Sequence, residues 1–102
     1  MIIEHAEFTI APTDAEAFEA AFLVGRESIA QAPGYHWSRL VRQIEDPGRY
    51  LLLIGWESLE AHMVDFRGSE LFTQWRAAVG PYFAAAPVLT HYQGGLEPAQ
   101  LD

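Results

Sequence analysis

The spacing of hydrophobic and polar positions divides the chain into alternating strand-like and helix-like segments. Residues 2–10, 35–44, 50–57 and 88–92 are rich in β-branched, aliphatic and aromatic types, and each segment predicts a strand. Apolar side chains recur at helical spacing from about residue 15 to 31, and again between residues 71 and 79. The order β-α-β-β-α-β predicts an α+β domain of ferredoxin-like type. In that fold, two helices cover one face of a four-stranded antiparallel sheet.

Capping and turn residues mark the ends of these segments. Thr13 with Glu16 has the spacing of a capping box at the start of the first helix. Residues 46–49 place Pro and then Gly at the centre of a turn, which favours type II geometry. Ser58 is expected to begin a short helix, which Gly68 breaks before Ser69 caps the next one.

The domain organisation follows from length and from the end of the last strand. A chain of 102 residues, half of them hydrophobic, is long enough for one domain with its own core. Residues 1–95 are expected to form this domain, and residues 96–102 a short flexible tail.

The third strand predicts a dimer. A sheet that is covered on one face should alternate apolar and polar residues, but residues 51–54 are continuously aliphatic. The second strand adds Tyr35, Trp37 and Val41, which should share a face. Because the two helices can cover only one face, a second copy of the chain is expected to cover the other, giving a homodimer.

Charge and composition exclude several classes of function. The net charge of -8 argues against binding to nucleic acid or to an anionic membrane surface. The chain has no cysteine, no lysine and no asparagine, so disulfides, thiolate chemistry and Schiff-base chemistry are absent. The first residues lack the basic and apolar regions of a signal peptide, which predicts a cytoplasmic protein.

Histidine, arginine and aromatic residues are the candidates for a site. The four histidines show no ligand-like spacing, so no metal site is expected. The many aromatic side chains favour either an ordinary core or a pocket for a flat aromatic ligand between the sheet and the second helix. Such a pocket would take its polar groups from arginines and histidines in the same segments, which are Arg39, Arg67, Arg76, His62 and His91.

His62 is the most specific candidate. Counted from Ser58, the side chains of Leu59, His62 and Phe66 should fall on one helical face. Leu59 and Phe66 are expected to face the sheet and to draw His62 inward. At that place a histidine is either a satisfied structural group or a proton acceptor for a bound ligand.

A family resemblance joins these features. The order and spacing of several short motifs resemble the antibiotic biosynthesis monooxygenase family over nearly the whole chain. These motifs are Pro33-Gly34-Tyr35, Tyr50-Leu51-Leu52-Leu53, Trp56-Glu57-Ser58, Glu60-Ala61-His62, Phe66-Arg67-Gly68-Ser69, Trp75-Arg76, Phe83, Pro87 and His91-Tyr92.

The resemblance implies a dimeric α+β barrel that oxidises a quinol or polyphenol-type aromatic with O2, without a metal, flavin or other cofactor. An electron-rich phenol that has lost its proton can pass an electron to O2 itself, so the protein need only bind the ring, stabilise the anion and exclude water. His62 would then act as base and Arg67 or Arg39 as the phenolate's partner. The residues expected to bind the substrate are Tyr35, Trp37, Arg39, Trp56, Phe66, Trp75 and His91.

Two other functions stay open from the sequence. One is a protein that binds heme or another hydrophobic ligand without turnover, and the other is a structural or stress-related dimer without catalysis. Relatives that degrade heme use an asparagine on the first strand and a histidine on the second helix. This chain has Ala6 and Arg76 near those positions, which does not fit heme degradation of that type.

Overall fold

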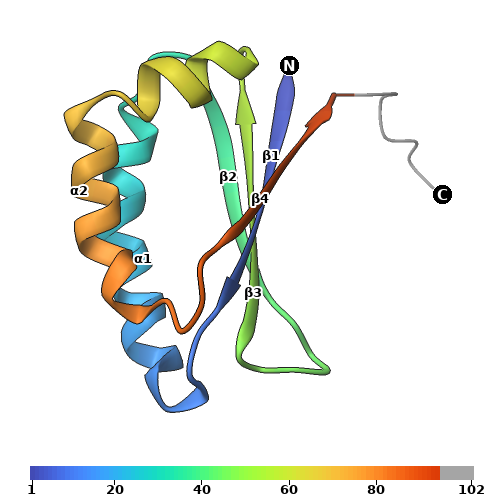
Figure 1. Ribbon diagram of the computed structural model, residues 1–102, viewed down its shortest axis with the longest axis vertical. Coiled ribbons are helices and arrows are strands. Elements are labelled where there is room, and N and C mark those ends of the chain that lie inside the picture. The colour runs from blue at the N-terminus through green and yellow to red at the C-terminus, as the bar shows by residue number, and fades with distance from the viewer. Residues whose placement is uncertain (95–102) are drawn as a thin grey trace, which may run out of the picture.

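The strands form one antiparallel sheet, and both long helices lie on the same face of it (Figure 1). The fold is that of a computed structural model, in which the structure describes residues 1–94; the tail expected at residues 96–102 lies outside the described residues. The strand order across the sheet is β2-β3-β1-β4. The elements are β1 (Ile2–Thr9), α1 (Ala15–Ala30), β2 (Tyr35–Arg42), β3 (Arg49–Trp56), α2 (Glu70–Val79) and β4 (Val88–Gln93). This order confirms the ferredoxin-like βαββαβ prediction.

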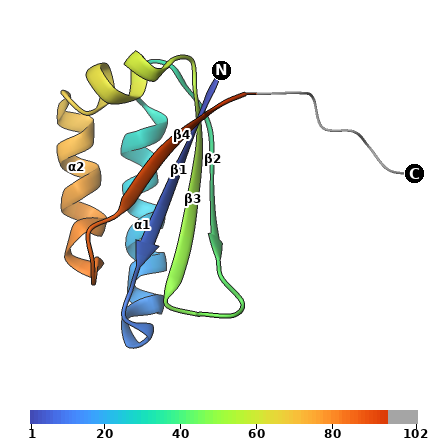
Figure 2. The same cartoon turned by 45° about the vertical axis from the view of Figure 1, so that its right-hand side comes forward.

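The helices and the sheet form two layers (Figure 2), and the hydrophobic core lies between them. Alternate residues of β1 and β3, such as Phe8 and Leu52, point into it and are almost fully buried. The two helices approach closely where Gly25 of α1 faces Trp75 of α2. A Cβ atom at Gly25 would lie 3.0 Å from the Trp75 ring, so the missing side chain is what lets the indole pack against α1.

Two local predictions are wrong. Thr13 does not cap α1, because Pro12–Asp14 forms a 3₁₀ turn that runs directly into the helix and places Asp14 at the cap position. The turn at residues 46–49 is not type II, which needs a positive φ at its third residue. Gly34 is the only glycine with a positive φ among the residues that the structure describes.

A π-helical turn, Ala61–Phe66, connects β3 to α2. The Ser58 hydroxyl accepts a hydrogen bond from the Ala61 amide at 3.1 Å, so Ser58 begins this segment as predicted. His62 and Phe66 are buried, also as predicted, but Leu59 is 48% exposed. The prediction for Leu59 fails because the helical segment, which begins at Leu59, widens into a π-helical turn at Ala61. This wider spacing takes Leu59 off the face that His62 and Phe66 share.

The face of the sheet opposite the helices is uncovered in the single chain and carries several apolar side chains. Leu51 and Leu53 point to this face, while Leu52 and Ile54 point to the helices. The outer face also carries Trp37, which is 37% exposed, together with Val41, Val88 and Tyr92.

Tyr35 does not share this outer face with Trp37, contrary to the prediction. The pairing of β2 with β3 shifts between these two residues, and such a bulge reverses the direction of the side chains that follow it. The Tyr35 ring therefore meets Trp56 on the helix side, with the two ring centres 6.2 Å apart.

No helix within residues 1–94 is both long enough and apolar enough to cross a membrane.

Candidate functional site

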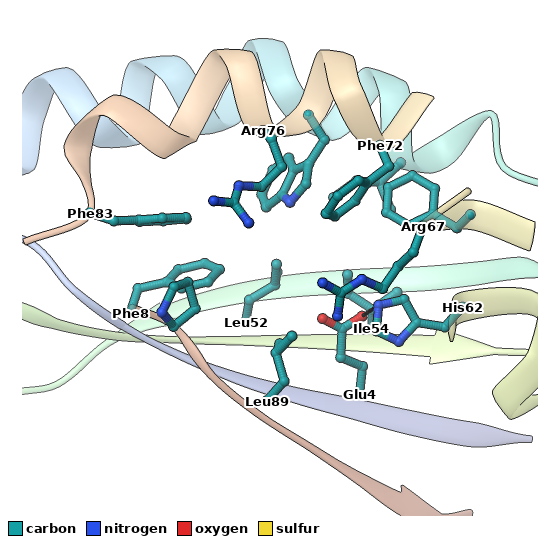
Figure 3. A pocket seen from close by; sticks show the side chains of 14 residues that line it. Glu4, Phe8, Leu52, Ile54, His62, Arg67, Phe72, Arg76, Phe83 and Leu89 are labelled. Carbon is teal, nitrogen blue, oxygen red and sulfur yellow. Dashed lines mark ion pairs between the residues drawn. The ribbon is translucent and has the colours of Figure 1, made fainter. Parts of the chain in front are cut away.

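A pocket opens between α2 and the sheet, on the side where β1 and β4 pair (Figure 3). The space in it that a water-sized sphere can occupy is about 40 Å³, within about 440 Å³ that includes the open space at its mouth. The sheet supplies Leu52 and Leu89, and α2 supplies Phe72 and Trp75. The walls are therefore mainly apolar and aromatic, as in pockets that bind small organic molecules.

One end of the pocket holds a row of three titratable groups in close contact, of which the two histidines are hydrogen-bonded to each other. The Nε2 atom of His62 lies 3.1 Å from Oε1 of Glu4, and Nδ1 of His62 lies 2.8 Å from Nε2 of His91. Glu4 and His62 line the pocket, whereas His91 lies behind them on β4, paired with Glu4 across the strands. Both ring nitrogens of His62 are thus engaged within the protein.

Trp56 holds this arrangement in place. Its indole Nε1 donates a hydrogen bond of 3.0 Å to Oε1 of Glu4. Its ring stacks on the His62 imidazole, with centres 5.2 Å apart and planes 12° from parallel. Since Trp56 is fully buried, it fixes both the carboxyl and the imidazole before any ligand arrives.

Burial shifts the pKa of Glu4, His62 and His91 in the direction that favours the uncharged form of each group. Burial raises the pKa of Glu4 to about 7, although the Trp56 hydrogen bond and the Arg67 charge partly oppose that shift. Burial, assisted by repulsion from His91 and Arg67, lowers the pKa of His62 to about 4. The pKa of His91 is also lowered, first by burial and then by the Arg67 charge. Near neutral pH, Glu4 is therefore close to its midpoint while both imidazoles are uncharged.

Two arginines enter the pocket from the helix side. The Arg67 guanidinium stacks over the Phe72 ring at 5.2 Å, and Arg76 stacks between Phe72 and Phe83 at 5.9 and 5.8 Å. Figure 3 shows both guanidinium groups directed toward the sheet. Neither forms an ion pair within 4.0 Å among residues 1–94, in a chain whose net charge is -8. These free positive charges can receive an anionic oxygen of a ligand.

The structure gathers most of the predicted site residues. His62, Arg67, Phe66 and Trp75 line the pocket, while Trp56 and His91 contact His62 or Glu4 from behind.

Three predicted residues lie outside this pocket. Trp37 is on the outer face of the sheet, Arg39 is on edge strand β2, and the Tyr35 hydroxyl pairs with Ser38 at 2.9 Å. Direct contact between these residues and a substrate stays a prediction that their placement does not favour.

Glu4 is the site residue that the sequence reasoning missed. The inward positions of the first strand run Ile2, Glu4, Ala6, Phe8, so Glu4 is the one charged residue in an otherwise apolar row. A carboxyl at an inward position needs a partner or a proton, because an isolated buried charge is strongly unfavourable. That break in the alternation was the available signal.

The acid and the two histidines do not surround a common point. They follow one another in a line, and no group of three His, Cys, Asp or Glu side chains within residues 1–94 has a geometry that could hold a metal ion.

Comparisons with known proteins agree with the fold and with the sequence resemblance. The model of the family described as "Antibiotic biosynthesis monooxygenase" matches residues 1–78. The uncharacterized protein YczJ of Bacillus subtilis is 33% identical over 93 residues, which cover 91% of this chain and 98% of that protein.

Two solved structures define the structural relationship. The crystal structure of a Bordetella bronchiseptica protein, named "Putative antibiotic biosynthesis monooxygenase", is 41% identical with a TM-score of 0.89, and the match covers 93% of this chain and 97% of that one. SnoaB, a cofactor-independent oxygenase from Streptomyces nogalater, is represented by the crystal structure of a mutant form. It is 16% identical with a TM-score of 0.76 and 97% of each chain covered, so the likeness is one of fold.

Proposed function

Because the chain belongs to the antibiotic biosynthesis monooxygenase family, we propose that it is a cofactor-independent monooxygenase that oxidises a small phenol or quinol with O2. One observation carries the proposal. An aromatic-walled pocket brings two arginines without carboxylate partners to face a buried pair, Glu4 and His62. These are the groups that binding and ionising a phenol requires.

The reaction balances without an added reductant. A phenol with a hydrogen opposite its hydroxyl group reacts with O2 to give a quinone and water. One oxygen atom enters the ring and the other leaves as water. The substrate supplies all four electrons, and the two hydrogen atoms of the water come from its O–H and C–H bonds. The protein's task is to make the phenolate and to hold it in a dry site.

Each pocket residue has a role in that task. Phe66, Phe72 and Trp75 form walls against which a flat ring can lie. The Arg67 guanidinium stabilises the phenolate oxygen, and His62 supports removal of the phenol proton through its contact with Glu4.

The alternative functions have less support from this geometry. A heme-binding protein would need a free imidazole in the pocket, but both nitrogens of His62 are engaged by Glu4 and His91. A purely structural domain gives no reason for two arginines beside an open apolar pocket.

The proposal is tested by measuring O2 uptake and quinone absorbance with a panel of phenols and quinols, and hemin binding in parallel. At least one phenol should be oxidised faster than it oxidises in buffer. Arg67→Gln should lower that turnover by about 10²–10³-fold, because one charged partner of the oxyanion is lost.

Arg26→Gln is the matched control, since Arg26 is exposed on α1 and does not line the pocket. Tight hemin binding without oxidation of any phenol would contradict the proposal.

The same family membership and the apolar outer face support a homodimer. Leu51, Leu53, Trp37 and Val88 present apolar surface on the face that the helices leave open. A second copy packed on this face would remove that surface from water.

A further inference from the structure

We propose that Glu4, His62 and His91 form a proton relay that connects the interior of the pocket with solvent at edge strand β4. The relay deepens the proposed function, on which its catalytic role rests. Glu4 would be the group that takes the phenol proton, and His62 and His91 would set its protonation state.

Of the three relay residues, Glu4 is the one that can contact a ligand directly. It lines the pocket at 5% exposure, and only its Oε1 atom is engaged, by Trp56 and His62. Its second oxygen makes no hydrogen bond within residues 1–94. His62 has no ring nitrogen left for a ligand, so it can act only through its two neighbours.

His91, at the opposite end of the row from Glu4, reaches the surface. His91 is only partly buried, does not line the pocket, and lies on edge strand β4. Its Nε2 atom faces His62 at 2.8 Å, and its Nδ1 atom makes no hydrogen bond in the part of the chain that the structure describes. A proton can therefore enter or leave at Nδ1 of His91.

Two arrangements of the protons are compatible with these contacts. When Glu4 is neutral, its O–H is directed to Nε2 of His62 across the 3.1 Å contact, and the Nδ1–H of His62 donates to Nε2 of His91. The Nδ1–H of His91, a partly exposed residue, has no partner among residues 1–94. When Glu4 is ionised, each imidazole carries its proton on Nε2, and the donors point toward the carboxylate. The two arrangements differ by one proton in total.

Conversion between them is the relay step. Glu4 gives its proton to Nε2 of His62, Nδ1 of His62 gives its proton to His91, and Nδ1 of His91 releases one to water. Neither imidazole is left charged, and the carboxylate that remains in the pocket can accept the O–H proton of a phenol. The reverse step returns one proton to Glu4 from solvent.

The surrounding charges suit this exchange. Arg67 and Arg76 are the other charged groups that line the pocket, and the remaining lining is apolar. Burial raises the pKa of Glu4 to about 7, so both arrangements are populated near neutral pH. Burial lowers the pKa of His62 to about 4, which keeps its ring neutral in both.

A test that needs no substrate follows the histidine nitrogens by NMR in the ¹⁵N-labelled full chain. As pH rises through about 7, both His62 and His91 should move their single proton from Nδ1 to Nε2, with one shared midpoint and without becoming charged. Glu4→Gln, which cannot ionise, should abolish this exchange, while Glu16→Gln on the exposed side of α1 should leave it unchanged.

Either of two results would overturn the relay. One is an unchanged tautomer on both histidines between about pH 6 and pH 8 in the wild type, which requires no variant to fold. The other is the same exchange persisting in Glu4→Gln.

A second test uses turnover. His91→Ala should slow phenol oxidation by about 10²-fold, and imidazole added to the buffer should restore it in a saturable way by replacing the lost end of the relay. His36→Ala is the matched control, because His36 is exposed and pairs with Glu57 outside the pocket. Full turnover of His91→Ala without imidazole would contradict the relay.

Absence of phenol oxidation by the wild type would instead contradict the proposed function, and the tautomer result would stand by itself.

Discussion

Glu4 shows how one residue can change the role that is assigned to a neighbouring side chain. From the sequence, His62 is a candidate base; in the fold, its two nitrogens are held by Glu4 and His91. A strand pattern can indicate that a carboxyl points inward, but it does not say which histidine from a distant segment will meet it. That partner depends on the register between β1 and β4 and on the turn that carries His62.

The pH dependence of stability should report the buried carboxyl. Because the pKa of Glu4 is raised from 4.5 to about 7, the folded chain keeps a proton there that the unfolded chain releases. That contribution to stability is full below pH 4.5 and is lost as the pH rises through about 7. The pKa of His62 is lowered from 6.5 to about 4, so its contribution is present above pH 6.5 and is lost as the pH falls through about 4.

Between pH 4.5 and pH 6.5, the contributions of Glu4 and His62 to the free energy of unfolding change in opposite directions. Glu4→Gln removes the contribution of Glu4. The variant should therefore gain stability with rising pH more steeply than the wild type below pH 6.5. At about pH 8 it should be more stable than the wild type by on the order of 1–3 kcal/mol. Urea unfolding at several pH values measures both effects, with Glu16→Gln as control. Parallel stability curves for wild type and Glu4→Gln would show that Glu4 is not a shifted buried acid.

Among the elements, the π-helical turn has the largest effect on the site. Its backbone bond joins the Arg67 amide to the His62 carbonyl at 3.1 Å, five residues apart in sequence. This wider spacing lets His62, Phe66 and Arg67 all face the pocket. Hydrophobic spacing predicted the inward direction of His62 and Phe66, but the same α-helical assumption placed Leu59 inward, where the structure leaves it exposed.

The strands were predictable to different degrees. Continuous aliphatic residues in β3 correctly indicated two apolar faces, because strand side chains alternate strictly. In β2 the alternation is broken by a bulge between Tyr35 and Trp37, and no residue type in that segment marks the bulge. For this reason Tyr35 and Trp37 were assigned to a common face.

Capping of α2 should matter for stability. The Ser69 hydroxyl accepts a hydrogen bond from the Phe72 amide at 3.4 Å and donates one to the Phe66 carbonyl at 2.6 Å. Ser69→Ala should therefore lower the free energy of unfolding by about 0.5–2 kcal/mol. Thr73→Ala, at an exposed position in the same helix, should change it by less than about 0.5 kcal/mol. Thermal or urea unfolding of the two variants decides this, and equal losses would argue against the cap.

The whole molecule has one covered and one open face. The helix-facing side contains the core and the pocket, and the opposite side presents apolar residues that nothing in the single chain covers. The sequence predicted this division, since two helices cannot cover both sides of one sheet. It also offered a pocket between the sheet and the second helix, but could not decide between that pocket and an ordinary core, because this depends on how far α2 stands from β1 and β4.

The homodimer is tested by placing a charge on the open face. Leu53→Arg should give monomer or aggregate, because burying an unpaired charge in the interface costs several kcal/mol. Leu23→Arg is the control: Leu23 is 53% exposed on α1, and the same substitution there should leave the assembly unchanged. Sedimentation velocity measures the result. A folded wild-type monomer at micromolar concentration would contradict the dimer.

The function of the molecule is tested most directly by following the oxygen atoms. After dialysis against a chelator, the protein is supplied with a phenol that it oxidises and with oxygen-18 gas, and the quinone product is analysed by mass spectrometry. The proposed reaction predicts undiminished turnover and one oxygen-18 atom in each product molecule, with the other in water. A product without oxygen-18, formed together with hydrogen peroxide, or turnover that returns only when a metal ion is added, would contradict cofactor-independent monooxygenation.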